Sequence, residues 1–237
     1  MRAAYQAFPG FHTELYRELQ PQLSGGPARR DISEQGELIA RISATLEPLV
    51  LGALTRAIAE RAPRRVLDIG CGAGLEFAAM LDAAPGADGV GIDVDDGAVA
   101  LAQRTLERRG LVGRGQVLHA DVRTPPDPSG PLAAPFQFAL LANVLYYLPM
   151  AERVVLLRHV AGLLAPGGIV FVVTTVTRPQ LFSRHFDLLL RAQEGQMELS
   201  SADVLTRQLT EAGFTPERPR PIAPGAPVVT VAAALPG

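Results

Sequence analysis

Short apolar runs alternate with amphipathic stretches along the middle of the chain, between residues 64 and 176. Strands of a parallel sheet are buried on both faces and read as apolar runs, whereas crossover helices carry apolar residues every three or four positions. The alternation therefore predicts βαβ units. The expected strands are residues 65–69, 89–93, 116–120, 136–142 and 169–176, and the expected helices are residues 75–84, 95–109 and 151–164.

After this region the pattern predicts one more helix and then a hairpin. Residues 202–212 have a helical pattern that ends at Gly213, and residues 214–222 and 228–234 read as two antiparallel strands. Glycine commonly follows the last turn of a helix, because it adopts the left-handed conformation without strain. We therefore expect an α/β fold with a doubly wound, Rossmann-like sheet over residues 63–237.

Two helical segments fall outside the sheet pattern. Residues 1–62 are expected to form an N-terminal cap, interrupted at residues 24–27, and residues 178–200 are expected to form a helical insertion. Open parallel sheets bind ligands at the carboxyl ends of their strands. Chain connectivity puts both segments beside that edge, so we expect them to cover the site, with the N-terminal segment acting as a lid.

Composition narrows the choice of partners. The 237-residue chain has a formal net charge of -2, which gives no basic footprint for nucleic acid. Cys71 is the single cysteine, so neither an intramolecular disulfide nor a cysteine metal cluster is expected. The chain also lacks the uninterrupted apolar run of about 18 residues that a membrane span needs. We therefore expect a cytoplasmic protein with no nucleic-acid, membrane or metal partner.

Glycines gather directly after the first expected strand. Gly70, Gly72 and Gly74 follow Asp68 in the run Asp-Ile-Gly-Cys-Gly-Ala-Gly. Glycines at such a turn let a ligand approach the backbone amides at the start of the next helix. The dinucleotide fingerprint would need glycine at the position of Leu75, so the spacing disfavours a nicotinamide-dependent oxidoreductase.

Two further acids end the neighbouring strands. Asp93 closes the second strand, where a carboxylate can accept from both hydroxyls of a ribose, and Asp121 follows the third strand, where it can accept from an adenine amino group. Asp93 could instead cap the next helix, and Asp121 could be an ordinary loop residue. Together with Asp68 and the glycines they predict one crevice for a nucleoside ligand, to which Cys71 contributes its backbone rather than a nucleophilic thiol.

Residues 64–176 and the terminal hairpin resemble the class I S-adenosylmethionine-dependent methyltransferase family. The resemblance rests on residues 68–74, which match the first motif of that family, and on Asp93, residues 121–122, 136–148 and 163–168. It implies S-adenosylmethionine as the cofactor and a seven-stranded sheet, mostly parallel, whose last strand is antiparallel. Gln137 departs from the aspartate of many relatives, but at the start of a strand, away from the crevice.

The resemblance also assigns cofactor contacts to individual residues. It implies that Asp93 binds the ribose, that Val94 packs on the adenine, and that Asp121 and Val122 lie at the adenine edge. Two more residues are candidates for the methionine end of the cofactor. Asn143 either contacts it or satisfies backbone groups at a strand end. Tyr16 either closes over it or packs in a core.

Residues that could act on the acceptor are harder to choose. His185 in the insertion and His12 in the cap are candidate general bases, with an ordinary surface position as the alternative for each. Tyr146 and Tyr147 follow the fourth strand, and one of them is expected to face the site. These four residues are the catalytic candidates.

The sequence therefore predicts an enzyme that transfers a methyl group from S-adenosylmethionine to a small-molecule acceptor. Natural-product biosynthesis is one setting that fits, and a homodimer is considered. The alternative is a protein that binds S-adenosylmethionine without methylating, either as a regulator or as an enzyme that uses only the charge of the sulfonium. The binding motifs would be the same in both cases.

Overall fold

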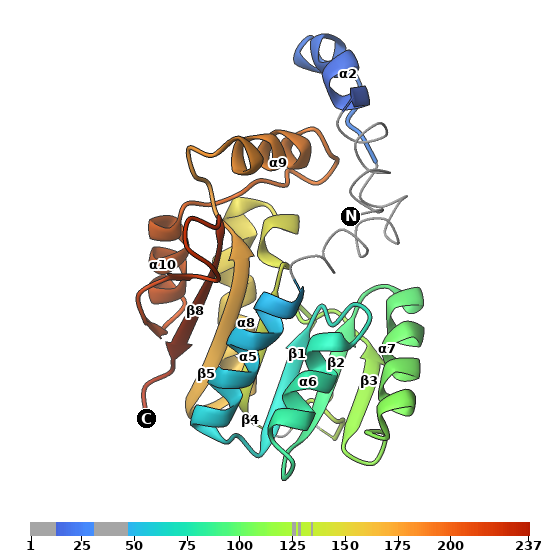
Figure 1. Cartoon of the computed structure of the whole chain (residues 1–237), viewed down its shortest axis with the longest axis vertical. Helices are drawn as coiled ribbons and strands as arrows, with labels where there is room; N and C mark the ends of the chain where they lie inside the picture. Colours follow the sequence, from blue (N-terminus) through green and yellow to red (C-terminus); the bar gives the residue numbers. More distant parts are fainter. Residues whose placement is uncertain (1–12, 31–46, 125–126, 128, 134) are drawn as a thin grey trace.

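The structure is a computed structural model that describes residues 13–30, 47–124, 127, 129–133 and 135–237 (Figure 1). Its centre is an eight-stranded sheet with the order β3-β2-β1-β4-β5-β8-β6, in which β7 also pairs with β8. The five strands that pair in parallel are β1 (Arg65–Ile69), β2 (Asp88–Asp93), β3 (Gly115–His119), β4 (Phe136–Ala142) and β5 (Leu164–Thr175). The mostly parallel, doubly wound fold expected from the sequence is confirmed.

The last strand of the chain, β8 (Val228–Ala234), runs antiparallel to β5, as expected. The strand count is a correction, because the first arm of the hairpin is split into β6 (Thr215–Pro216) and β7 (Arg220–Pro221), which both pair with β8. Proline lacks an N–H and cannot donate to a ladder. Pro216, Pro219 and Pro221 therefore break one expected arm into two short strands.

Helices cover both faces of the sheet. On one face α5 (Glu47–Arg61), α6 (Leu75–Ala83) and α7 (Asp96–Arg109) bury their apolar sides in one core cluster (Figure 1). On the other face α8 (Arg153–Leu163) and α10 (Ala202–Glu211) pack in a second cluster. Because β4 contributes buried residues to both clusters, its run of apolar residues follows from its central place in the sheet.

The cap expected over residues 1–62 is corrected at its end. Helix α5 buries Val50, Leu54, Ala57 and Ile58 in the same cluster as α6, so it belongs to the core rather than to a lid. Of the earlier residues, the structure describes α2 (Glu14–Leu23) and the stretch to Arg30. The expected insertion contains α9 (Leu181–Arg191), which lies beyond the carboxyl ends of β4 and β5 (Figure 1).

Two boundaries near β4 also differ from expectation. The segment after β4 forms two 3₁₀ turns, η2 (Leu145–Tyr147) and η3 (Met150–Glu152), before α8 begins. The turn expected at residues 166–168 lies within β5, whose residue Leu164 already pairs with Phe136. The register shifts between Phe136, which pairs with Leu164, and Phe138, which pairs with Ile169, and this irregularity accommodates residues 165–168 of β5. None of the helices in the described part of the chain is long and apolar enough to cross a membrane.

Candidate cofactor site and its cover

The glycine loop joins β1 to α6 and is tied to the next strand. The backbone N–H groups of Gly70 and Cys71 both donate to the carbonyl of Ile92, at 2.8 and 3.0 Å. Gly70, Gly72 and Gly74 have φ angles of 70, 51 and 73°, in the left-handed region that favours glycine. The sequence therefore folds into a tight turn at the carboxyl ends of β1 and β2.

The three glycines have different reasons to be small. A Cβ on Gly74 would lie 2.9 Å from Ala102 of α7, and one on Gly70 would lie 2.6 Å from Cγ2 of Val144. These two glycines allow close packing of neighbouring elements. At Gly72, by contrast, no described atom lies within 4 Å of the Cβ position. Gly72 therefore faces open space, as a backbone that is approached by a ligand would.

Asp93 is held beside this open position. Its Oδ2 accepts from the N–H of Gly72 at 2.9 Å, and its Oδ1 accepts from the N–H of Asp95 at 3.0 Å. Asp95 in turn caps α7, because its Oδ1 accepts from the N–H of Ala98 at 2.7 Å. Helix capping is thus the task of Asp95, and Asp93 holds the end of β2 against the glycine loop.

Asp68 is the most unusual charged group of the site. Its side chain is 2% exposed, and Oδ2 has no hydrogen-bond partner within the described residues. Burial raises its pKa well above the usual range, and the nearby carboxylates of Glu76 and Asp93 raise it further. A cationic ligand group near Asp68 would relieve both the desolvation and the repulsion. This unpaired oxygen beside an open glycine loop fits the amino and sulfonium groups of S-adenosylmethionine.

Cys71 lies within the loop but is not placed to react. The residue is 3% exposed, and burial, followed by the charges of Asp68 and Asp93, raises the pKa of its thiol. A thiol held in its protonated form is a poor nucleophile. This environment agrees with the expectation that Cys71 does not supply a nucleophilic thiol.

The ends of β2 and β3 contain the residues expected around adenine. Val94 is 63% exposed directly after β2, and Val122 is half-buried against the second core cluster. Asp121 is engaged by a residue that the sequence reasoning missed: Arg123 donates to its Oδ1 at 3.0 Å and to its Oδ2 at 2.6 Å. This contact lowers the pKa of Asp121, so the group is a carboxylate that any adenine contact would share with Arg123.

The segment after β4 brings polar and aromatic groups to the same edge. Asn143 adopts a φ of 59° and donates its N–H to the carbonyl of Val173 at 2.7 Å, so its backbone N–H is already paired. Tyr146 is 5% exposed, and Tyr147 lies against it with ring centroids 4.6 Å apart. Burial raises the pKa of both phenols, which makes neither of them a proton acceptor at neutral pH.

The N-terminal segment and the insertion meet above this edge. The hydroxyl of Tyr16 lies 2.9 Å from Nδ1 of His185, and their rings are 5.4 Å apart. The backbone of Arg29 donates to the carbonyl of Ala192 and accepts from the N–H of Glu194, at 2.8 and 2.9 Å. Two of the residues chosen from the sequence are therefore in contact. His12 lies outside the described residues.

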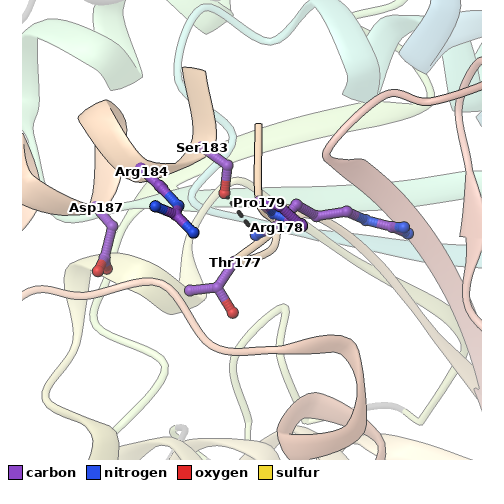
Figure 2. A pocket seen from close by; sticks show the side chains of 6 residues that line it. All are labelled: Thr177, Arg178, Pro179, Ser183, Arg184 and Asp187. Atoms are coloured by element: carbon purple, nitrogen blue, oxygen red, sulfur yellow. Dashed lines mark hydrogen bonds between the residues drawn. The ribbon is translucent and has the colours of Figure 1, made fainter. Parts of the chain in front are cut away.

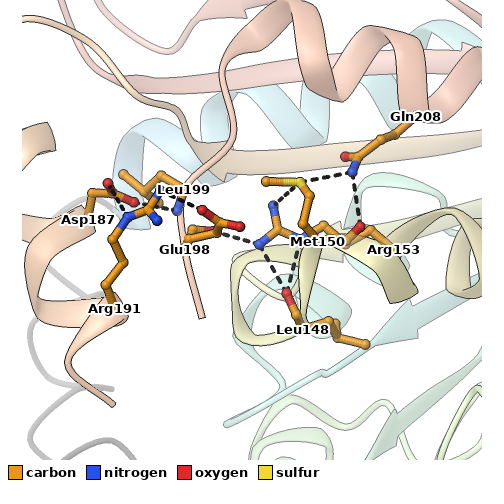
Figure 3. A network of polar contacts seen from close by, with 8 residues as sticks. All are labelled: Leu148, Met150, Arg153, Asp187, Arg191, Glu198, Leu199 and Gln208. Atoms are coloured by element: carbon orange, nitrogen blue, oxygen red, sulfur yellow. Dashed lines mark hydrogen bonds and ion pairs between the residues drawn. The ribbon is translucent and has the colours of Figure 1, made fainter. Parts of the chain in front are cut away.

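Helix α9 is fastened to the core by a buried cation that the sequence did not reveal. Arg153, 1% exposed, donates to the carbonyls of Leu148 and Glu198, at 3.0 and 2.6 Å from Nη2 (Figure 3). Asp187 of α9 accepts from the N–H of Leu199 at 2.8 Å. An arginine at the start of a helix gives no sign of this role in sequence, because its acceptors are backbone carbonyls and one of them, that of Glu198, lies far along the chain.

A cavity of about 390 Å³ opens beside the first turns of α9, away from the residues chosen for the cofactor. It is lined by Thr177, Arg178, Pro179, Ser183, Arg184 and Asp187 (Figure 2). The guanidinium of Arg178 points away from that of Arg184, so the two cations do not converge on one ligand (Figure 2). The glycine loop, with its open position and unpaired carboxylate oxygen, is therefore the better candidate for the cofactor.

Comparison with known proteins identifies the family of the chain. A family model described as a methyltransferase domain matches residues 39–218, more than half of the chain. The chain belongs to this methyltransferase-domain family, which confirms the resemblance carried by residues 68–74.

The curated relatives match over a limited region. The demethylmenaquinone methyltransferase of Thermus thermophilus is 36% identical over 110 residues, which is 46% of each chain. The ubiquinone biosynthesis O-methyltransferase of Bordetella bronchiseptica is 32% identical over 139 residues, 58% of this chain and 53% of the relative. The chain thus spans about half the length of the curated relatives it matches.

Solved structures share the fold at lower identity. An O-methyltransferase family protein from Burkholderia thailandensis has a TM-score of 0.81 and 17% identity, over 100% of this chain and 71% of that chain. A second similar structure is the O-methyltransferase NcsB1 from neocarzinostatin biosynthesis, in complex with S-adenosyl-L-homocysteine and 1,4-dihydroxy-2-naphthoic acid. It has a TM-score of 0.67 and 23% identity, over 99% of this chain and 70% of that chain.

Proposed function

We propose that the chain is a methyltransferase that uses S-adenosylmethionine to methylate a small-molecule acceptor. The observation that carries the proposal is the convergence of Asp68, Gly72 and Asp93. A buried carboxylate oxygen without a described partner, a glycine facing open space and a second carboxylate lie together at the ends of adjacent strands. This is the chemistry that a cationic nucleoside ligand requires.

The proposed contacts follow from the chemistry of each group. The cofactor supplies a methyl group on a positively charged sulfur, which is already a good leaving group. Asp93 would accept from the ribose hydroxyls while keeping the N–H of Gly72, because a carboxylate has several lone pairs. Val94 offers an exposed apolar surface for the adenine, and Asp68 would face the positive charge.

The task of the chain on the acceptor side is mainly to position it. Holding the acceptor atom in line with the methyl group and excluding water removes much of the entropic barrier of the transfer. A base is needed only where the acceptor must lose a proton. Because burial keeps Tyr146 and Tyr147 protonated, His185 is the better candidate for that role.

We further propose oxygen as the methylated atom and natural-product biosynthesis as a setting. Both rest on what the names of similar proteins say: the Bordetella relative is an O-methyltransferase of ubiquinone biosynthesis, and NcsB1 is one of neocarzinostatin biosynthesis. The described part of the N-terminal segment would act as a cover through its contact with α9. A homodimer stays a prediction that light scattering can test.

Titration calorimetry tests the cofactor. We expect S-adenosylhomocysteine to bind at micromolar concentration and NAD to show no heat of binding. The reverse preference would overturn the proposal. Mass spectrometry with S-adenosylmethionine and a panel of hydroxyl, amine and carbon acceptors then tests transfer. Binding of the cofactor without any product across that panel would favour the alternative, a protein that binds S-adenosylmethionine without methylating.

A further inference from the structure

Four aromatic side chains form a continuous row between α9 and the end of β4. The rings of Phe182 and Phe186 on α9 are stacked with centroids 6.1 Å apart, and Phe186 meets the edge of Tyr146 at 5.4 Å. Tyr146 meets Tyr147 at 4.6 Å, again edge to face. These spacings lie in the range in which aromatic rings attract one another. We call these four residues the aromatic row.

The segment that carries the inner end of the aromatic row packs on the glycine loop. Val144 lies two residues before Tyr146, and its Cγ2 would be 2.6 Å from a Cβ on Gly70. The segment that carries Tyr146 and Tyr147 is therefore packed directly on the loop proposed to hold the cofactor. An acceptor lying along the row would approach the region of the cofactor from the side of β4.

The outer end of the row is open. Phe182 is 55% exposed, whereas Phe186 and Tyr147 are half-buried and Tyr146 is buried, so the open surface of the row lies on α9. Leu181, next to Phe182, is 81% exposed. Contiguous exposed apolar surface on a folded protein commonly marks a binding site. His185 and Tyr16 place a polar edge beside the row, because His185 lies between Phe182 and Phe186 on the same helix.

We propose that the aromatic row binds the acceptor and selects a planar aromatic ring. A flat ring can continue the offset and edge-to-face geometry that the four side chains already show, whereas a puckered saturated ring of the same size cannot. The cavity of Figure 2 lacks this property, since none of the residues that line it is aromatic. This inference rests on the proposed methyltransferase function and names its substrate class.

A matched pair of probes tests the selection. Protein saturated with S-adenosylhomocysteine is titrated in a calorimeter with 1-naphthol and with decahydro-1-naphthol, which have the same carbon skeleton and hydroxyl group but differ in planarity. We expect 1-naphthol to bind roughly three- to tenfold more tightly, a ratio typical of aromatic contacts beyond simple burial. Equal affinity, or binding of neither probe to the loaded protein, would overturn the inference.

Variants locate the effect. Phe182→Leu removes an exposed ring without disturbing the core and should lower the 1-naphthol preference to near one, whereas Phe182→Trp should keep it. Leu101→Ala, at a 48% exposed position on α7, is the control and should leave the preference unchanged. An unchanged preference in Phe182→Leu would contradict the inference. Binding of S-adenosylhomocysteine is measured in every variant, because its absence in the parent would instead refute the proposed function.

Discussion

The hydroxyl of Tyr16 lies 2.9 Å from Nδ1 of His185, across 169 positions of the sequence. One residue belongs to α2 and the other to α9, so the contact joins the N-terminal segment to the insertion. The backbone pairing of Arg29 with residues 192 and 194 strengthens the same junction. Because α9 also carries the aromatic row, whatever holds α2 on α9 bears on access to the site.

Tyr16→Phe tests this junction. The variant keeps the ring but loses the hydrogen bond to His185, which at this exposed position should change the free energy of unfolding by less than about 1 kcal/mol. The effect should be local: hydrogen exchange at the amides of Arg29 and Glu194 should become faster, while amides of β4 keep their protection. Unchanged exchange at both amides would mean that the hydrogen bond does not hold the segment.

Asp93 is expected to control cofactor affinity. Asp93→Ala removes the acceptor for Gly72 and the ribose hydroxyls, and should weaken S-adenosylhomocysteine binding by about 2–4 kcal/mol. Asp93→Asn should lose less affinity, because the asparagine amide keeps one acceptor oxygen where the carboxylate had two. Calorimetry on Asp96→Ala supplies the control, since that carboxylate lies nearby with a side chain 87% exposed. Equal affinity of the parent and Asp93→Ala would contradict the ribose assignment.

Asp68 should oppose stability in the absence of ligand. The pKa of Asp68 is raised in the folded protein, so the folded state binds this proton more tightly than the unfolded state does. The resulting contribution to the free energy of unfolding is fully present below the unfolded pKa and is lost as pH rises through the folded pKa. The parent should therefore lose stability as pH rises above about 4, relative to Asp68→Asn, which carries no charge. Thermal unfolding of both proteins across this range measures the difference. Parallel curves would show that the carboxylate is not destabilising.

The same group should make cofactor binding depend on pH. The positively charged sulfonium of S-adenosylmethionine favours the charged form of Asp68, so the affinity of the parent for S-adenosylmethionine should increase as pH rises through the raised pKa. Asp68→Asn should bind more weakly and with a flatter pH profile. If the two profiles have the same shape, the titrating group is another residue.

Local patterns predicted the five parallel strands well, but neither the start of β5 nor the split in the first arm of the hairpin. The bounds of β1 and β4 agree with expectation, because their apolar runs are bordered by clear turn signals, and α7 begins after Asp95 and ends before Gly110 as its capping residues indicate. Helix α5 was assigned to the cap because its residues show that it is helical but not which surface buries it. The buried surface of α5 is determined by its packing against α6, which the sequence of α5 alone does not show.

Part of the site was equally visible in the sequence, and part was not. Glycines and acids that follow predicted parallel strands could be placed together from the sequence, because such strands end at the same edge of the sheet. The pairing of Asp121 with Arg123, the contact of Tyr16 with His185 and the aromatic row all depend on side-chain directions or on segments distant in sequence. No periodicity encodes such contacts.

The buried guanidinium of Arg153 should hold in place the insertion at residues 178–200, on which the N-terminal segment rests. It donates to the carbonyl of Leu148, directly after Tyr147, and to that of Glu198 at the end of the insertion (Figure 3). Arg153→Met would leave both carbonyls without their donor, and should lower the free energy of unfolding by roughly 3 kcal/mol. Arg158→Met is the matched control on the same helix, because Arg158 makes one exposed contact of 3.2 Å to Glu211.

A purely global loss of stability would leave the native contacts of Arg153→Met intact below its unfolding temperature. We expect more, because the guanidinium joins the segment after β4 to the insertion that carries α9. Hydrogen exchange at Leu199, whose amide donates to Asp187, should quicken in Arg153→Met at 10 °C below its melting temperature, and 1-naphthol should bind more weakly at unchanged S-adenosylhomocysteine affinity. Arg158→Met should change neither. If Leu199 keeps its protection in Arg153→Met, the arginine stabilises the core without positioning the cover.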